Sequence, residues 1–384
     1  MKRIVALAMC LAWAAGAAAQ EQPAPASKPL TWADCVALAL RKNPDLASSF
    51  AAAEAQRAAY RGSFNGVMPS LTLSNGYSDS SSNLTGNRWS AQATADMDLF
   101  NPAKLAGIRS ASASLTQAEA NRRLTSASVR FNLWQAFMQV LFAERSIEVN
   151  RRILQLRDND ARLVALRYDS GRESKGNMLR AKAQLQQAQA DLNQAMRNLR
   201  ADQTALDRQL GLDEFQRVEA TGTLTALPPP AFPEDPSSWL ARRPDVAVQQ
   251  AVVEGARASL SSARSSLWPT LSGNYTRGRL GRDEFPSSGY SWIGGLTLSY
   301  PLFGGGPTST YYAIKAADRS LERAQQDLRS VRDQAVTDLE TSWASYAGAV
   351  DQVSVQEQLL EAARQRNDEA DVRYASGLLT YDNW

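Results

Sequence analysis

Side chains that could carry acid–base or metal chemistry are scarce in this sequence. The 384 residues include no histidine, which is the commonest general base and the commonest metal ligand in proteins. Two cysteines occur, Cys10 and Cys35, and no nucleophile stands beside a base in a recognisable pattern. We therefore expect no catalytic residue, no metal and no cofactor, and a hydrolase is the weakest of the functions considered.

Two glycine-rich segments resemble nucleotide-binding loops only superficially. In Gly171-Arg-Glu-Ser-Lys-Gly-Asn177, Asn177 and Met178 stand where a phosphate-binding loop requires Lys and then Ser or Thr, and a long predicted helix precedes the segment instead of a strand. Gly304-Gly-Gly306 lacks the dinucleotide-binding spacing and is better explained as the joint between a strand and a helix. Neither segment predicts nucleotide binding.

The N-terminus predicts export. Lys2 and Arg3 precede an apolar run that ends in Ala17-Ala-Ala19, which is the layout of a secretory signal peptide over residues 1–19. A lipoprotein would need Gly, Ala or Ser before its lipidated cysteine, whereas Met9 precedes Cys10. We therefore expect an exported chain that is not lipidated.

The expected mature chain has one cysteine and nearly balanced charge. Cys35 cannot form an intrachain disulfide alone, so we expect it to be a small apolar residue of a helix. Loss of Lys2 and Arg3 lowers the formal charge from +3 to +1, which gives no reason to expect nucleic acid as a partner. No later segment approaches the about 20 apolar residues of a transmembrane helix.

The rest of the chain is a duplication in which three motifs occur twice, in the same order. They are Asn43-Pro-Asp-Leu-Ala47 with Arg243-Pro-Asp-Val-Ala247, Met68-Pro-Ser-Leu71 with Trp268-Pro-Thr-Leu271, and Arg167-Tyr-Asp-Ser-Gly171 with Arg373-Tyr-Ala-Ser-Gly377. The offsets of 200, 200 and 206 residues are far longer than the period of a solenoid repeat. Each copy is therefore expected to do the same structural job.

The duplication predicts the organisation of the chain. A first repeat over 20–212 contains an entry helix, a hairpin over about 70–100, a long helix over about 103–167 and a returning helix over about 177–210. A Pro-rich linker over 213–236 leads to a second repeat over 237–384, with a hairpin over about 270–303 and a long helix over about 308–373. The second repeat lacks a counterpart of the returning helix, so we interpret the chain as a fragment or a truncated product.

The long helices are predicted to pack against other helices. A 65-residue helix would extend roughly 97 Å, and apolar residues recur along it at the spacing of a coiled-coil seam. Phe137 and Val140 add a second apolar face, so each helix should contact neighbours on two sides. The seam positions are Leu124, Phe131, Trp134, Met138 and Leu141, then Leu185, Ala188, Leu192, Ala195, Leu199 and Leu206, and in the second copy Leu339, Trp343, Tyr346, Val350, Val353 and Leu360.

The two hairpins show strict alternation, which a strand explains and a helix does not. One face is apolar and aromatic and the other is polar, with the second hairpin turning through a loop over 277–288. Strands of about ten residues with this pattern are typical of a transmembrane β-barrel. Residues expected on the lipid-facing side are Trp89, Leu99, Tyr290, Trp292, Leu298 and Tyr300, whereas Asp96 and Asp98 fall on the polar side.

Four strands cannot close a barrel by themselves. In lipid, each unpaired backbone N–H or C=O group would cost roughly several kcal/mol, as buried polar groups without a hydrogen-bond partner do. Copies of the chain would therefore have to pool their strands. The alternative from alternation alone is an ordinary half-buried hairpin in a soluble protein.

These features together resemble the TolC family of outer membrane efflux proteins. The resemblance extends over almost the whole mature chain and implies a homotrimer with a shared twelve-stranded transmembrane barrel that continues into a periplasmic tunnel of coiled-coil helices. The motifs that carry it are Asn43-Pro-Asp-Leu46, Met68-Pro-Ser-Leu71, Asp98-Leu-Phe100, Tyr300-Pro-Leu-Phe-Gly304 and the two Arg-Tyr-x-Ser-Gly segments.

The resemblance also implies a function. Such a protein is a passive exit duct in the cell outer membrane for small molecules such as drugs, toxic compounds or metals, or for type I protein secretion. Its expected partners are outer membrane lipid, a periplasmic adaptor (membrane fusion) protein and an inner-membrane transporter. The alternative is a soluble periplasmic coiled-coil adaptor or scaffold whose hairpins merely cap its helices.

Candidate site residues follow from the same resemblance. The adaptor is expected to dock at the tunnel tip, and Asp96 and Asp98 would face the barrel lumen and influence which ions pass, unless they are simply solvated. Members of the family often carry Asp where this chain has Asn177 and Asn383, so no acidic entrance ring is assumed. The expected tip residues are Arg167, Tyr168, Ser170 and Gly171 with Arg373, Tyr374, Ser376 and Gly377, whose glycines should end the long helices.

Overall fold

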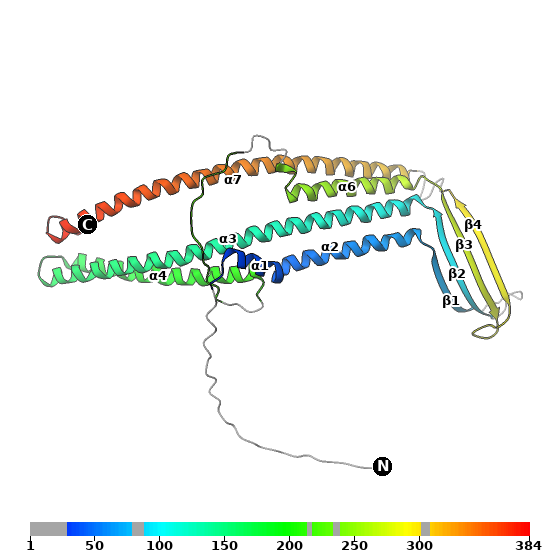
Figure 1. Ribbon diagram of the computed structural model, residues 1–384, viewed down its shortest axis with the longest axis horizontal. Helices are drawn as coiled ribbons and strands as arrows, with labels where there is room; N and C mark the ends of the chain where they lie inside the picture. Colours follow the sequence, from blue (N-terminus) through cyan, green and yellow to red (C-terminus); the bar gives the residue numbers. More distant parts are fainter. Residues whose placement is uncertain (1–28, 79–87, 213–216, 233–238, 301–307) are drawn as a thin grey trace, which may run out of the picture.

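The protein is elongated, with long helices that run from a helical tip at one end to a small sheet at the other (Figure 1). The structure, a computed structural model, describes residues 29–78, 88–212, 217–232, 239–300 and 308–384. The predicted signal peptide, the first hairpin's loop over 80–87 and Gly304–Gly306 lie outside the described residues.

The entry segment is a broken helix, as Asn43-Pro44 predicts. Thr31 caps α1 (Trp32–Lys42) in a capping box, in which the backbone N–H of Thr31 donates to the Asp34 carboxylate at 3.1 Å. Asn43 then caps α2 (Pro44–Ser63) by accepting from the backbone N–H of Leu46 at 3.0 Å. A short 3-10 helix, η1 (Phe64–Val67), leads from α2 to the sheet.

Four further helices form the body. These are α3 (Pro102–Asp169), α4 (Lys175–Leu210), α6 (Pro244–Ser265) and α7 (Ser309–Ala375). At 1.5 Å per residue, the 68 residues of α3 extend about 100 Å. α3 packs along α4 towards the tip and along α2 and α6 towards the sheet, while α7 packs along α6. α3 is three residues longer than the sequence predicts, and α7 is one residue longer.

A hydrophobic core lies at mid-length, where α1 packs on α3 and α4. Phe137, Val140 and Leu206 are buried there with Cys35, and the rings of Trp32 and Phe137 are 5.8 Å apart. Burial raises the pKa of the Cys35 thiol to about 11, with the nearby Asp34 carboxylate contributing. Cys35 is thus the small buried helix residue that the sequence predicts.

The predicted coiled-coil seams are only partly covered. On α4, Ala188, Leu192, Ala195 and Leu206 are buried as expected. On α3, however, Phe131 and Trp134 are 62% and 49% exposed, because α4 covers the Phe137 and Val140 side of that helix instead. These two predicted seam residues are therefore not covered within the single chain, and their packing against another helix stays a prediction.

The linker, over residues 217–232, crosses the second long helix. Trp343 donates its indole N–H to the carbonyl oxygen of Pro230 at 2.9 Å, and the Tyr346 hydroxyl donates to that of Leu227 at 2.8 Å. The Phe232 ring packs edge-on against Trp343 at 5.7 Å. Two residues of the predicted α7 seam thus contact the linker.

One antiparallel sheet closes the other end of the molecule. It contains β1 (Ser70–Ser78), β2 (Arg88–Phe100), β3 (Thr270–Gly281) and β4 (Tyr290–Ser299) in the order β1-β2-β3-β4. The two hairpins therefore lie side by side, one from each copy, and a β-bulge between Asp98 and Phe100 marks where β2 leads into α3. β3 continues through Arg277 to Gly281, residues that the sequence analysis assigned to a loop.

None of the helices in the described part of the chain is long and apolar enough to cross a membrane.

Candidate functional site

Both long helices end at the tip with the same turn. In each copy the glycine has a positive φ, 74° at Gly171 and 81° at Gly377, which only glycine adopts without strain. Each glycine N–H donates to the tyrosine carbonyl three residues earlier, at 2.9 Å and 3.1 Å, and the next N–H reaches the arginine carbonyl, at 2.8 Å and 2.9 Å. This is the Schellman geometry, so the predicted helix-ending role of the glycines is confirmed.

The serines of the repeated motif also act alike. Ser170 and Ser376 each donate their hydroxyl to the carbonyl of the arginine three residues before them, at 3.0 Å in both copies. That carbonyl would otherwise be one of the unsatisfied acceptors at a helix C-terminus. The sequence Arg-Tyr-x-Ser-Gly is therefore, in part, a helix-stop signal.

The two tyrosines of the motif have different environments. Tyr374 is 1% exposed and packs with Val164 of α3 and Ala181 of α4 in a small core. The indole of Trp384 stacks on its ring at a centroid distance of 4.4 Å and an interplanar angle of 7°. Tyr168, the equivalent residue of the first copy, is 36% exposed. The tip of α7 thus packs against both α3 and α4 through Tyr374.

Arg167 joins the two tips. Its Nη2 donates to the carbonyl oxygens of Tyr374 at 2.6 Å and Ala375 at 3.0 Å, and its guanidinium carbon lies 4.1 Å from the centroid of the Tyr374 ring. The contact places a cation on the negative end of the α7 dipole and on the face of an aromatic ring, both favourable. Arg167 therefore caps a helix of the other copy.

A carboxylate completes the cluster. The Tyr374 hydroxyl donates to Glu173 at 3.2 Å, and the Asn177 amide donates to the same carboxylate at 2.7 Å. The Asn177 hydrogen bond is the main cause that lowers the pKa of Glu173 below its usual range, whereas burial and the Glu173 charge raise the pKa of Tyr374. Sequence reasoning missed Glu173 because the second copy has Leu379 at that position.

The second arginine of the repeat has no such partner. Arg373 is exposed, and its side chain makes no hydrogen bond, ion pair or ring contact with any residue that the structure describes. Of the eight predicted tip residues, Arg167 and Tyr374 use their side chains in contacts between the two tips of one chain. The remaining six lie at or near the surface of the tip. Adaptor docking by these residues stays a prediction.

At the other end of the molecule, the sheet has one apolar and one polar face. The register pairs Tyr77 with Trp89 and Leu271 with Leu298, so these residues share the apolar face. A Cβ on Gly273 would lie 3.8 Å from the Leu99 side chain, so Leu99 is on this face too. Large apolar residues predicted as lipid-facing are well exposed: Leu99, Tyr290, Trp292, Leu298 and Tyr300, which follows β4, at 50% to 70%, with Trp89 half-buried against Tyr77.

The same face carries two arginines that the sequence analysis placed in a loop. Arg277 pairs with Trp292 and Arg279 pairs with Tyr290 across β3 and β4, and the Arg277 guanidinium lies 4.7 Å from the Tyr290 ring centroid. The spacing of Tyr275, Arg277 and Arg279 continues the two-residue period, which is the signal that could have extended the strand. These arginines lie beside aromatic residues near the loop end of the sheet.

The two predicted lumen aspartates differ in their contacts. Asp98 forms an ion pair with Lys104 at 2.6 Å and accepts from the Asn101 amide at 3.0 Å, at the joint between β2 and α3. Asp96 is exposed on the polar face, and its carboxylate has no comparable partner in the described part of the chain. Whether either residue faces a lumen stays a prediction.

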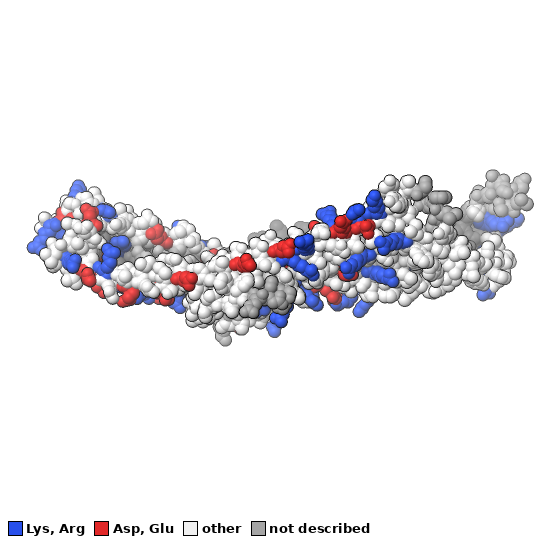
Figure 2. Space-filling view, turned by 90° about the horizontal axis from the view of Figure 1, so that it is seen from above, with Lys and Arg blue, Asp and Glu red and all other residues white. Residues whose placement is uncertain are grey.

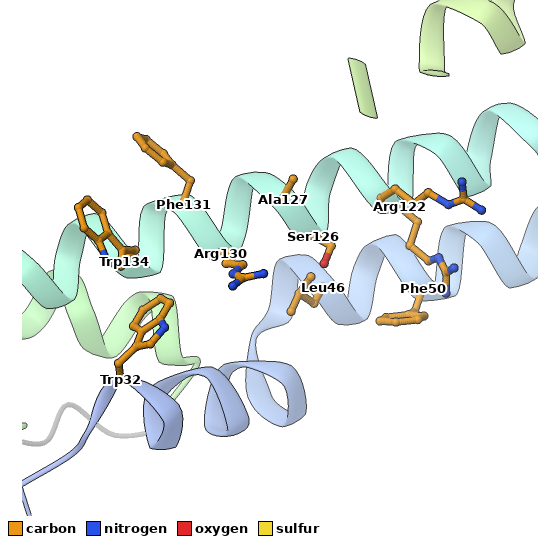
Figure 3. Close-up of a pocket in the computed structure, with 10 residues that line it drawn as sticks. Trp32, Leu46, Phe50, Arg122, Ser126, Ala127, Arg130, Phe131 and Trp134 are labelled. Atoms are coloured by element: carbon orange, nitrogen blue, oxygen red, sulfur yellow. The ribbon is translucent and has the colours of Figure 1, made fainter. Parts of the chain in front are cut away.

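A groove of about 840 Å³ lies between the first two helices and α3 (Figure 3). Exposed aromatic residues, among them Phe131 and Trp134, line it, and the Arg122 guanidinium lies 4.9 Å from the Phe50 ring centroid.

The described residues contain no cluster of three or more His, Cys, Asp or Glu side chains that could hold a metal ion. Figure 2 shows basic and acidic side chains interspersed along the helices, with wide uncharged areas near the sheet.

Comparison with known proteins gives a family match over most of the chain. Residues 35–212 and 236–383 match the family described as outer membrane efflux protein. The two matched segments are separated by residues 213–235.

Individual relatives are similar to the chain at the level of sequence and of fold. The pyoverdine export outer membrane protein OpmQ of Pseudomonas aeruginosa is 30% identical over 301 residues, covering 72% of this chain and 58% of the relative. The cobalt-zinc-cadmium resistance protein CzcC of Cupriavidus metallidurans is 27% identical over 236 residues, covering 59% and 54%. The chain thus spans little more than half the length of the curated relatives it matches.

A solved structure confirms the fold. The outer membrane protein VceC of Vibrio cholerae superposes with a TM-score of 0.79 at 19% identity, covering 92% of this chain and 87% of that structure. The predicted fold class of long packed helices with four strands is therefore confirmed. The predicted alternative of a soluble adaptor or scaffold is not supported, since the matching proteins are outer membrane proteins.

Proposed function

We propose that this chain, which belongs to the outer membrane efflux protein family, is the subunit of a passive exit duct through the outer membrane. The sheet would lie in the membrane and the helices would extend into the periplasm, as family membership and the polarity of the two ends favour. The duct has no chemistry of its own, so energy would come from an inner-membrane transporter. The duct would act by conducting its cargo and by docking a partner protein.

The observation that carries this proposal is the open sheet with one apolar face. Its outer strands β1 and β4 each have one neighbour among the described strands, and in lipid their unpaired backbone groups would need partners. A homotrimer supplies them, because β4 of one subunit can pair with β1 of the next. Three sheets of four strands would give the twelve-stranded barrel that the family resemblance implies.

The helical body supports the same assembly. Phe131 and Trp134 form an exposed aromatic surface on α3, and Val353 and Leu360 of α7 are 43% and 52% exposed. Contiguous apolar surfaces of this kind mark protein interfaces. Subunits packed side by side would cover them and enclose a tunnel lined by helices.

The tip is the proposed docking place for a periplasmic adaptor. The turns after α3 and α7 project beyond the helices (Figure 1) and expose Ser170, Gly171, Ser376 and Gly377. An adaptor bound there would connect the duct to the inner-membrane transporter. The cargo would be small molecules or metal ions, given that relatives are named for pyoverdine export and for cobalt, zinc and cadmium resistance.

Cell fractionation tests the proposal. Expressed with its own N-terminus, the protein should be found in outer membranes, and detergent extracts should contain a trimer that resists SDS and dissociates on heating. A monomer in the soluble periplasmic fraction would contradict the duct.

A further inference from the structure

We propose that Arg373 of each subunit caps the α3 helix and covers the Tyr168 ring of the neighbouring subunit, repeating between chains the contact that Arg167 and Tyr374 make within one chain. This inference rests on the trimer of the proposed function and names the residues that join its subunits at the tip. The occupant of the exposed Tyr168 surface is thus a second copy of this chain.

One half of a symmetrical arrangement is already formed within the single chain. Arg167 of the first copy donates to the carbonyls of Tyr374 and Ala375 and lies on the Tyr374 ring. The second copy carries the same residue types at the same turn, which both the Schellman and the serine hydrogen bonds reproduce. A first-copy arginine therefore recognises a second-copy tip.

The complementary half, from Arg373 to the end of α3, is not formed among the residues described in the single chain. Arg373 is exposed without a side-chain partner among the described residues, and Tyr168 is 36% exposed at the end of α3. Among the residues that the structure describes, no arginine or lysine side chain donates to the last carbonyls of α3 as Arg167 does to those of α7. The donor, Arg373, thus lies on the second copy of the motif, and the acceptor, the end of α3 with the Tyr168 ring, lies on the first copy.

The arrangement can close into a ring. A contact between unlike surfaces of identical subunits, head to tail, forms a ring when the rotation closes. In a trimer, first-copy and second-copy tips would alternate around the tunnel mouth. Each second-copy tip would then meet a first-copy tip on its far side, where Arg373 reaches Tyr168.

The two contacts differ in the carboxylates beside them. Asp169 stands in α3 where α7 has Ala375, so the contact between subunits would set the Arg373 cation beside an additional exposed carboxylate. Within the chain, the Glu173 carboxylate accepts a hydrogen bond from the Tyr374 hydroxyl. The contact between subunits would lack such a carboxylate, because Leu379 occupies the corresponding position. The Arg373 cation would therefore face the Asp169 carboxylate, whereas the Arg167 cation faces Glu173 within the chain.

Paired cysteines test the contact in the full chain. An arginine lying on a tyrosine ring holds the two backbones farther apart than a disulfide allows, so the reagent is a short bismaleimide. Cys35 is buried and can remain. We expect the Tyr168→Cys, Arg373→Cys double variant to give a covalent trimer on denaturing gels, while each single variant gives none.

The chain offers its own matched control. The Arg167→Cys, Tyr374→Cys double variant carries the same two substitutions at the contact within one subunit. It should react with one bismaleimide per chain, measured by mass, and still migrate as a monomer after denaturation. This result shows that the reagent spans an arginine–tyrosine contact of this geometry.

Light scattering in detergent, recorded first on the unmodified protein, separates the two proposals. A trimer in which the Arg167→Cys, Tyr374→Cys pair reacts but the Tyr168→Cys, Arg373→Cys pair gives no covalent oligomer would overturn the contact and leave the duct intact. A monomer overturns both.

A second measurement does not rely on cysteine. Arg373→Ala should lower the temperature at which the trimer dissociates, and Arg373→Lys should not restore it fully, because lysine lacks the planar fork. Arg172→Ala, at an exposed tip arginine, is the control and should cause no shift. Equal shifts for Arg373→Ala and Arg172→Ala would contradict the contact.

Discussion

The two copies of the Arg-Tyr-x-Ser-Gly segment have the same backbone and different surroundings. Both end a long helix in the same hydrogen-bonded turn, yet Tyr374 is buried and Tyr168 is exposed. The backbone turn depends on local chemistry, which duplication preserves. The side-chain contacts depend on which tip packs against which, and inside one chain only one of the two orders occurs. A duplicated motif can therefore retain its fold and still divide its contacts between the chain and its neighbours.

The largest expected effect comes from removing the ring of each of the two tip tyrosines, Tyr374 and Tyr168. Tyr374→Ala should destabilise the tip by about 3 kcal/mol, because it deletes a buried aromatic ring. In dissociated subunits, Tyr168→Ala should cost under about 0.5 kcal/mol, the usual range for surface substitutions. Hydrogen exchange of the α7 C-terminus measures both. Equal losses of protection would show that the two tyrosines are not distinct.

A smaller effect is expected from the arginine that joins the tips. Arg167→Ala should cost about 1 kcal/mol, from lost hydrogen bonds to the end of α7 and lost contact with the Tyr374 ring. Arg373→Ala should have no such effect in the dissociated subunit, where the Arg373 side chain makes no hydrogen bond, ion pair or ring contact with the described residues. Limited proteolysis at the tip reports the difference, and comparable cleavage of both variants would contradict it.

Acid should loosen the same joint. Because the pKa of Glu173 is lowered in the folded protein, its contribution is fully present above the usual carboxyl range and is lost as pH falls through the lowered value. The groups facing it are Arg167, Asn177 and Tyr374. The tip should therefore gain exchange at acid pH in the unmodified protein, and less so in Glu173→Gln. An identical pH profile in both would remove Glu173 from the joint.

The smallest effect concerns the hairpins, which also differ between copies. The first carries Asp96 and Asp98, whereas the second carries Arg277 and Arg279. Asp96→Asn should reduce cation preference in planar bilayers if Asp96 faces the lumen, and Asp98→Asn should do so less, because Lys104 already neutralises that carboxylate. Unchanged selectivity in Asp96→Asn would exclude the lumen position.

Local patterns in the sequence predicted the elements well. The capping box at Thr31, the break at Asn43 and the alternation of Trp89 to Leu99 each depend on neighbours along the chain, so the residues themselves carry the signal. β3 was cut short because Arg277 and Arg279 on an otherwise apolar face resemble loop residues. The strand continues because its ladder to β4 satisfies the backbone whatever the side chain.

The packing between distant segments could not be predicted in the same way. Phe131 and Phe137 are both large and apolar on one helix, yet one is exposed and the other is in the core. The choice depends on where α1 and α4 settle against α3. Likewise, nothing local marks Glu173 as the partner of a tyrosine about two hundred residues away, since that pairing exists only once the tips have docked.

The linker's hold on α7 has a consequence for how this sequence can change over time. Trp343 and Tyr346 donate to the carbonyls of Pro230 and Leu227, so both acceptors belong to the main chain, which every amino acid supplies. Substitutions at these linker positions therefore keep the acceptors. An insertion or deletion between Leu227 and Pro230 would change their spacing of three residues, which matches the spacing of Trp343 and Tyr346 on α7. Selection should tolerate drift in the composition of this linker segment and conserve its length.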